Sequence, residues 1–170
     1  MSVRNAFAKI LQKSGAMTVN WRDVDQEAVT DIEQQLVEYS RGNQPNVIAS
    51  APDFDAPFVV SFDYNIGTPA QVNPNTTNLV AILYNIDFKE WRVKTITDMA
   101  ASGTVSFDNL PETWNGTKVY LYCYTQCFEN ADQKQAYYNA GIFGAVGDIK
   151  VAESNAKYSK TLYVGSGNVG

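Results

Sequence analysis

The residues of this chain that could take part in chemistry are two cysteines and a few scattered carboxylates. The sequence contains no histidine, which removes the commonest acid-base group, the commonest zinc ligand and the middle member of most catalytic triads. Three carboxylates, Asp87, Glu90 and Asp98, fall between predicted strands, where solvated acidic residues are ordinary. The sequence therefore predicts no catalytic residue, no metal site and no cofactor, and we expect a protein that is not an enzyme.

The two cysteines are expected to be reduced. Cys123 and Cys127 lie four residues apart within one predicted strand, which would place their Cα atoms roughly 13 Å apart at ~3.3 Å per residue. A disulfide requires a Cα separation below about 7 Å. We therefore predict two buried free thiols, and reduced cysteines accord with synthesis in a cytosol.

Three glycines, Gly141, Gly144 and Gly147, form the nearest approach to a nucleotide-binding loop. Their G-x-x-G-x-x-G spacing matches neither the dinucleotide fingerprint nor the P-loop, and the strand-turn-helix context is missing. Two interpretations of this segment stay open: an excursion packed against the rest of the domain, or a loop that contacts a partner. In the second interpretation the contacting residues are Tyr137, Tyr138, Ile142 and Phe143.

The charge distribution argues against nucleic acid as a direct partner. The formal net charge is −5, with five basic and eight acidic residues in 1–56 and eight basic and ten acidic residues in 57–170. Neither part supplies the basic field that a phosphate backbone requires. No run approaches the ~18 apolar residues of a membrane span, and residues 1–14 lack the uninterrupted apolar core of a signal peptide. We therefore expect no contact with a membrane.

Residues 1–42 are predicted to form an N-terminal helical arm of two short amphipathic helices. The first ends near Gly15, and the second begins after Asp23 or Asp25 and ends near Gly42. Their apolar stripes are Val3, Phe7, Ile10 and Leu11 in the first helix and Val29, Ile32 and Leu36 in the second. A helix of ~12 residues is marginal alone, so each stripe must pack on something. Packing on the chain's own domain and docking on a neighbouring subunit both stay open.

The rest of the chain predicts strands. Residues 43–56 contain prolines and no helical period, which indicates an extended connector. Residues 57–170 are predicted to be the main domain, because the apolar period changes there from 3.6 to 2. The predicted strands cover 58–64, 79–84, 91–96, 104–107, 117–127 and 158–165. The last two are separated by far more than an ordinary hairpin loop, so an insertion is expected at about 129–157.

A hydrophobic corner precedes the longest strand. Leu110-Pro111 and Trp114-Asn115-Gly116 stand directly before a strand with one apolar row and one tyrosine row, as in immunoglobulin and fibronectin type III domains. The sequence therefore predicts a mostly β protein: an immunoglobulin/fibronectin III-like antiparallel sandwich with an N-terminal helical arm.

Three stretches also carry a family resemblance: an aliphatic strand ending in Tyr-Asn at 78–85, the Leu-Pro and Trp-Asn-Gly corner, and the closing stretch 159–165. Over about residues 57–170 the chain resembles a family of uncharacterised proteins, a domain of unknown function, encoded by Bacteroidota and their bacteriophages. The chain departs from that family in starting on a helix and in lengthening the loop before the final strand. The resemblance implies a sandwich fold and no activity.

These features lead us to expect a structural virion protein of a bacteriophage, either an auxiliary capsid or head decoration protein or a neck or tail component. Its partners would be other virion proteins, with the major capsid protein as one candidate, in a multi-copy assembly. It would reside in the virion after synthesis in the host cytoplasm. The alternative is a carbohydrate- or cell-surface-binding module, in which Tyr120, Tyr122 and Tyr124, with Trp91 nearby, would stack on sugar rings.

Overall fold

The structure is a computed structural model that describes residues 26–143 and 152–170. The chain divides into two compact units, residues 1–39 and 40–170. In the first unit the described part contains helix α2 (Gln26–Gln35). The predicted first helix, with Val3, Phe7, Ile10 and Leu11, lies outside the described residues.

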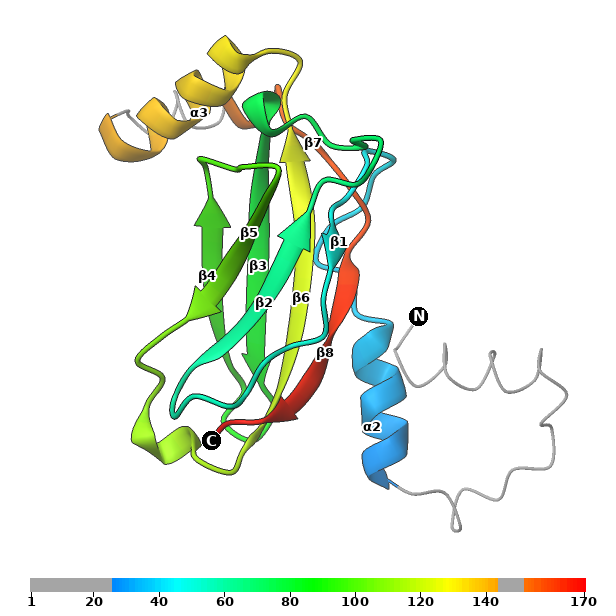
Figure 1. Cartoon of the computed structure of the whole chain (residues 1–170), viewed down its shortest axis with the longest axis vertical. Coiled ribbons are helices and arrows are strands. Elements are labelled where there is room, and N and C mark those ends of the chain that lie inside the picture. The colour runs from blue at the N-terminus through cyan, green and yellow to red at the C-terminus, as the bar shows by residue number, and fades with distance from the viewer. Residues whose placement is uncertain (1–25, 144–151) are drawn as a thin grey trace, which may run out of the picture. The chain divides into compact units, whose positions relative to one another are not determined.

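The second unit is a sandwich of two antiparallel sheets, which stand face to face in Figure 1. One sheet has the order β1 (Ile48–Ala49), β2 (Val60–Asn65) and β5 (Ser102–Phe107). The other has the order β4 (Glu90–Ile96), β3 (Thr77–Asn85) and β6 (Lys118–Cys127), and the far edge of β6 pairs with β7 (Lys157–Tyr158) and β8 (Leu162–Asn168). The prediction of a mostly β antiparallel sandwich is confirmed.

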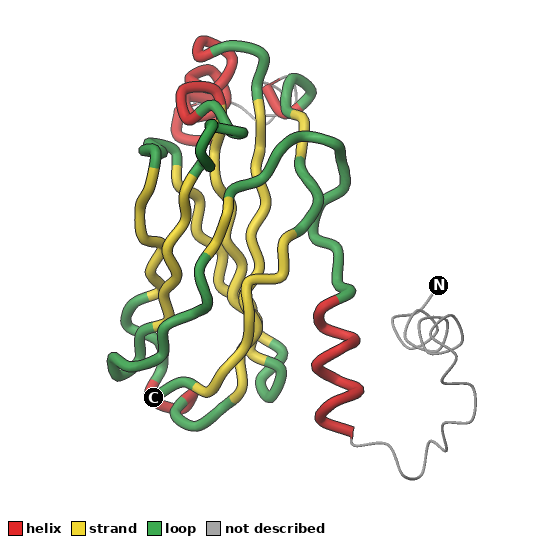
Figure 2. Tube along the Cα trace, turned by 45° about the vertical axis from the view of Figure 1, so that its right-hand side comes forward, coloured by secondary structure: helices red, strands yellow, loops and turns green. Residues whose placement is uncertain are grey.

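The predicted insertion contains a helix. Helix α3 (Ala131–Phe143) follows β6 and lies at one end of the sandwich, and the C-terminus lies at the other end (Figures 1 and 2). Asn130 caps it, because its Oδ1 accepts a hydrogen bond from the Gln133 N–H at 2.9 Å. Lys134 of α3 donates its ammonium proton to the Pro74 carbonyl at 2.9 Å. This bond ties the helix to the loop that precedes β3.

The core lies between the two sheets because side chains alternate across each strand. Strands β3 and β6 pair over nine residues, with Leu83 opposite Leu121 and Ala81 opposite Cys123 on the inner face. The facing sheet adds Val60, Phe62, Tyr64, Val105 and Phe107. All of these side chains are buried. The period-2 pattern thus corresponds to one buried row in β2 and β5, whereas β3 and β6 are buried on both faces.

The hydrophobic corner is confirmed. Trp114 is 1% exposed and ends a single 3-10 turn, Glu112–Trp114, that closes one end of the sandwich. Gly116 then donates its N–H to the Val169 carbonyl at 2.8 Å, and Val169 donates its own to the Thr117 carbonyl at 3.0 Å. The corner therefore fixes the start of β6 against the C-terminal end of the chain.

The segment predicted as a connector, residues 43–56, is extended but belongs to the sandwich. Val47 is buried in the core, and Ile48–Ala49 forms the edge strand β1. Thr125 of β6 donates its hydroxyl proton to the Pro45 carbonyl at 2.6 Å. The sequence placed the start of the domain at 57, whereas the compact unit begins at Ser40. Sequence reasoning missed this pairing for two reasons. A strand of two residues leaves no alternating pattern, and the prolines around it indicated a connector.

The predicted end of the second helix near Gly42 is too late. Helix α2 ends at Gln35, and Gly42 serves a different purpose. A side chain at this position would overlap the backbone carbonyl of Tyr158, because the two backbones are in close contact. The backbone hydrogen bond from the Gln44 N–H to the Tyr158 carbonyl, at 3.2 Å, requires the two segments to lie this close. The glycine thus marks a strand-like contact and not a helix stop.

The packing of residues 52–54 against β8 generates a stability prediction. A Cβ at Gly167 would overlap the ring of Phe54, so Gly167→Ala is expected to lower the free energy of unfolding by about 1–3 kcal/mol. Phe54→Ala removes the ring that the new Cβ would meet. When Phe54 is already alanine, Gly167→Ala is therefore expected to lower the free energy of unfolding much less. Urea denaturation of the four proteins measures the difference.

Gly141→Ala provides the matched control for this experiment. Nothing lies within 4 Å of a Cβ at this helical glycine, so alanine is expected to stabilise the protein by about 0.5–1 kcal/mol. Equal costs of Gly167→Ala with and without the Phe54 ring would contradict the packing described above.

Candidate interaction surface

The exposed large hydrophobic side chains gather around one edge strand. Among the described residues five are exposed, and three of these, Phe88, Trp91 and Val93, lie within six positions on β4 and the turn before it. Trp91 is 51% and Val93 63% exposed. We call these three residues the β4 surface. Exposed apolar side chains that cluster, and do not occur singly, mark interaction sites.

The β4 surface is held by its neighbours in the sheet. Tyr84 of β3 pairs with Trp91, and the two rings stack with centroids 4.7 Å apart and planes at 23°. Val93 pairs with Ile82 on the same face. The exposed side chains therefore continue a buried apolar row of β3. Rigid aromatic side chains of this kind supply contact area at low entropic cost.

The opposite face of β4 is cationic and points toward the other sheet. Arg92 places its guanidinium carbon 4.7 Å from the centroid of the Trp114 ring and forms an ion pair with Glu90 at 3.5 Å. Lys94 donates to the Ser106 carbonyl of β5 at 2.8 Å. Inward-pointing charges on an edge strand oppose uncontrolled strand-to-strand pairing. The geometry therefore favours contact through the outward face of β4.

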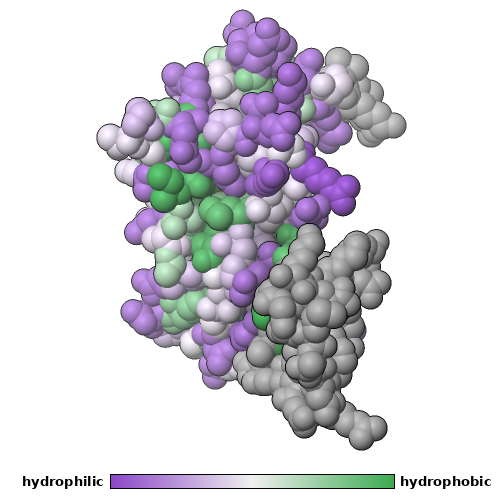
Figure 3. Space-filling model, turned by 90° about the vertical axis from the view of Figure 1, so that its right-hand side faces the viewer, coloured by the Kyte–Doolittle hydropathy of each residue, from purple (hydrophilic) through white to green (hydrophobic). Residues whose placement is uncertain are grey.

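The other edge of the sandwich, where β1 and β8 lie, also presents apolar atoms. Figure 3 looks onto this side and shows hydrophobic residues gathered near its middle, with polar residues around them. Ile48 of β1 is 49% exposed. This side carries one large exposed hydrophobic side chain among the described residues, so it is a weaker candidate than the β4 surface.

The tyrosine row of β6 is not an open platform. Tyr120 and Tyr122 are 1% and 0% exposed, and Tyr122 lies 5.6 Å from Tyr163 between ring centroids. Tyr124 is half-buried and lies 6.0 Å from Tyr158. The two buried rings cannot stack on a sugar in this structure. The expected proximity of Trp91 to this face is real, because Tyr84 pairs with both Trp91 and Tyr120.

The predicted partner-contacting residues are distributed unevenly. In α2, Val29 is buried and Ile32 is half-buried, and Leu36, directly after the helix, is half-buried. Tyr137 of α3 packs on Phe128 with ring centroids 5.5 Å apart, whereas Tyr138 is 43% exposed. Ile142 and Phe143 form the C-terminal end of α3. The four residues of the first predicted helix lie outside the described part of the chain.

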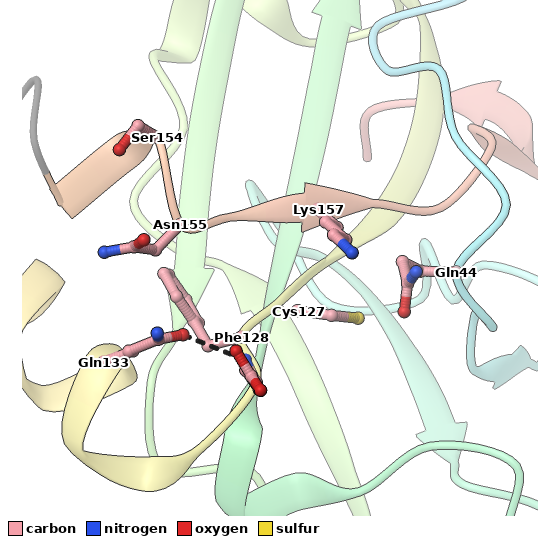
Figure 4. A pocket seen from close by; sticks show the side chains of 8 residues that line it. Gln44, Cys127, Phe128, Gln133, Ser154, Asn155 and Lys157 are labelled. Atoms are coloured by element: carbon pink, nitrogen blue, oxygen red, sulfur yellow. Dashed lines mark hydrogen bonds between the residues drawn. The ribbon is translucent and has the colours of Figure 1, made fainter.

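A polar cavity of about 460 Å³ lies where β6 runs into α3, and Figure 4 shows its lining. Cys127 and Lys157 face it from the paired strands β6 and β7, and Gln133 faces it from α3. The Cys127 thiol contacts the hydroxyls of Thr125 at 3.6 Å and Thr77 at 3.8 Å. A threonine hydroxyl is not a base, so these contacts do not activate the thiol as a nucleophile.

Both cysteines are free and buried, as predicted. Within residues 26–143 and 152–170, no group of three or more cysteine, aspartate or glutamate side chains could hold a metal ion. None of the helices in these ranges is long and apolar enough to cross a membrane.

No protein-family model matches this chain, and no curated protein matches it. The family resemblance drawn from the sequence motifs therefore stays a prediction.

The β4 surface was missed by sequence reasoning. The alternation at 91–96 predicted the strand, but alternation alone does not say which row faces the core. The charges of Arg92 and Lys94 were misleading, because charged side chains are expected to face solvent. In the structure both side chains turn toward the other sheet. Long cationic side chains can cover apolar surface while their charged ends find partners. This property allows the apolar row to stay outside.

The buried thiol of Cys123 generates a pH prediction. Burial raises the pKa of Cys123 from 9.0 to about 12. The folded protein therefore holds this proton more tightly than the unfolded chain, and the resulting stability is complete below pH 9 and is lost as pH rises toward 12. The free energy of unfolding is expected to fall by up to ~1.4 kcal/mol per pH unit from this group.

Urea denaturation between about pH 9 and 11 tests this expectation against Cys123→Ala, which should show a shallower slope. Burial, with Tyr158 and Tyr137 nearby, also raises the pKa of Tyr124, but that contribution is common to both proteins and cancels. Identical slopes for the two proteins would contradict the assignment.

Proposed function

We propose that this chain is a structural protein of a bacteriophage particle, an auxiliary capsid or head decoration protein or a neck or tail component, and that it works through protein-protein contacts. The observation that carries the proposal is the β4 surface, where Trp91 and Val93 are exposed on the outward face of β4 and Phe88 is exposed in the turn before it. Such a cluster costs solvation free energy in an isolated protein. A partner that covers the cluster removes this cost.

The partner we propose is another virion protein, with the major capsid protein as one candidate, in a multi-copy assembly located in the virion. The sandwich supplies a rigid body because its two sheets share one continuous core. The separate compact unit at residues 1–39 supports a role as an arm, with the stripe Val29, Ile32 and Leu36 as its described part. The phage assignment itself comes from the family resemblance.

The alternative function, a carbohydrate- or cell-surface-binding module, has less support in its predicted form. Its two central rings, Tyr120 and Tyr122, are buried. Sugar stacking requires an accessible aromatic face. An aromatic pair with an exposed member does occur at Tyr84 and Trp91, but its neighbour Val93 is apolar. Such surroundings suit a protein partner better than a polyhydroxylated ligand.

We also infer that the sandwich is of the immunoglobulin or fibronectin III kind. In that arrangement the first, second and fifth strands share one sheet, and the third, sixth and last share the other. The order β1-β2-β5 and the neighbours β3, β6 and β8 follow this scheme. Strand β4 joins the second sheet beside β3, and the short β7 is an addition.

The proposal predicts that this chain is found in purified particles. Mass spectrometry of virions from the source organism is expected to detect it at a constant ratio to the major capsid protein. Detection only in the soluble fraction of infected cells would sink the proposal.

Contact through the β4 surface predicts a specific loss. The full-length double variant Trp91→Ser, Val93→Ser is expected to enter particles at least about tenfold less, because truncating an interface hot spot costs about 2 kcal/mol or more and tenfold corresponds to about 1.4 kcal/mol. Copy number per particle is measured by quantitative mass spectrometry.

The matched control is the pair of single variants Val93→Ser and Ile48→Ser, which make the same kind of change on opposite edges of the sandwich. Val93→Ser should reduce incorporation and Ile48→Ser should not. Thermal denaturation establishes that all variants are folded. Equal incorporation of the double variant and the unmodified protein would place the contact elsewhere.

A further inference from the structure

The corner before β6 holds a dipeptide with a chemistry of its own. Asn115-Gly116 is the single Asn-Gly pair of the sequence, and both residues are exposed. In such a pair the backbone nitrogen of the glycine can attack the side-chain amide carbon of the asparagine. Glycine leaves that approach open because it has no side chain. In an unfolded chain Asn115 is therefore prone to lose its amide group.

The reaction needs only water and a base from the solvent. The base takes the proton from the Gly116 nitrogen, a bond forms between this nitrogen and Cγ of Asn115, and the bond from Cγ to the amide nitrogen breaks. That nitrogen takes a proton from water and leaves as ammonia. Water then opens the five-membered ring. Attack at Cγ gives aspartate, and attack at the main-chain carbonyl gives isoaspartate, in which the backbone runs through the former side chain.

The turn geometry opposes ring closure. Residues 114–117 form a type II β-turn, in which Asn115 has φ −53° and ψ 127° and Gly116 has φ +76°. The Thr117 N–H closes the turn by donating to the Trp114 carbonyl at 2.9 Å. Closing the ring requires the Gly116 nitrogen to eclipse Cβ of Asn115 about the Cα–C bond, and in an L-residue this requires a negative ψ. The turn holds ψ at the opposite sign, so it must open first.

A second restraint acts on the attacking nitrogen itself. The Gly116 N–H donates to the Val169 carbonyl at 2.8 Å, and the Val169 N–H donates to the Thr117 carbonyl at 3.0 Å. Val169 is 1% exposed and belongs to the core. The Phe58 N–H holds the next residue, because it donates to the Gly170 carbonyl at 3.0 Å. An amide that donates such a bond loses its proton only after local opening. The nitrogen therefore stays unreactive while Val169 stays in place.

We propose that Asn115 is a site of spontaneous modification that the fold keeps closed, and that release of Val169 from the corner opens it. Isoaspartate at this position adds one carbon to the backbone inside the turn. The turn bond to Trp114 and the bond from Gly116 to Val169 then no longer form together with the same geometry. The modification thus makes a transient opening permanent. The proposal rests neither on the β4 surface nor on the virion assignment.

The test is the rate at which Asn115 is modified in the full-length protein. The protein is incubated at mildly alkaline pH, where the Gly116 nitrogen loses its proton more readily, and peptide mass spectrometry follows asparagine, aspartate and isoaspartate at this position. The folded protein is expected to react at least about tenfold more slowly than the same protein unfolded in concentrated urea, since the reaction requires local opening. Equal rates in the two states would overturn the proposal.

A matched pair of variants tests the role of Val169. Val169→Ala is expected to raise the rate in the folded protein about tenfold, because it removes buried contacts that hold the corner closed. Val72→Ala makes the same change at another core position, 3% exposed, in the loop before β3. The start of β3 pairs with the end of β6, far along the strand from the corner. This control should leave the rate close to that of the unmodified protein.

Equal acceleration by the two variants would mean that global unfolding, and not release of Val169, admits the reaction, which would overturn the proposal. Thermal denaturation establishes that both variants are folded, and Asn115→Gln provides a folded protein that lacks the reactive side chain. Amide hydrogen exchange of the unmodified protein gives a measurement that needs no variant. The Gly116 N–H is expected to be protected, and exchange at the rate of an unfolded chain would contradict the hydrogen bond to Val169 on which the proposal rests.

Discussion

The pairing of β3 with β6 is the constraint on which the rest of this structure depends. Nine consecutive residue pairs, from Thr77 and Cys127 to Asn85 and Val119, fix the register. With β3 held in place, a shift of β6 by one residue would turn Leu121 outward and bring Tyr122 into the core. Burial on both faces makes that register unusually well specified, since every side chain of β3 except Tyr84 is buried.

The positions of the exposed surfaces follow from the pairing of β3 with β6. Strand β4 is attached to β3, so its exposed row, Trp91 and Val93, continues the outer row of β3 and its cations reach across to Trp114 and β5. On the other side, β8 pairs with β6 and carries Gly167 against Phe54. The same register places Asn78 on the outer face, where its amide donates to the Gln126 side chain at 3.1 Å.

The β4 surface is apolar, so its free energy of association would come from area removed from water. The thiols take no part in that surface, because Cys123 is buried with a raised pKa and the Cys127 thiol lies against the hydroxyls of Thr77 and Thr125.

The sequence by itself determined the elements whose signal is local. The period-2 rows predicted β2 to β6, the Leu-Pro and Trp-Asn-Gly stretch predicted the corner, and the spacing of Cys123 and Cys127 excluded a disulfide. The single last strand expected at 158–165 is instead two elements, β7 (Lys157–Tyr158) and β8 (Leu162–Asn168). The tertiary structure alone decided features that depend on distant partners. Residues 43–56 join the sandwich because Gln44, Pro45 and Val47 find partners far along the chain. Which row of β4 faces outward is likewise set by long-range packing that no local pattern encodes.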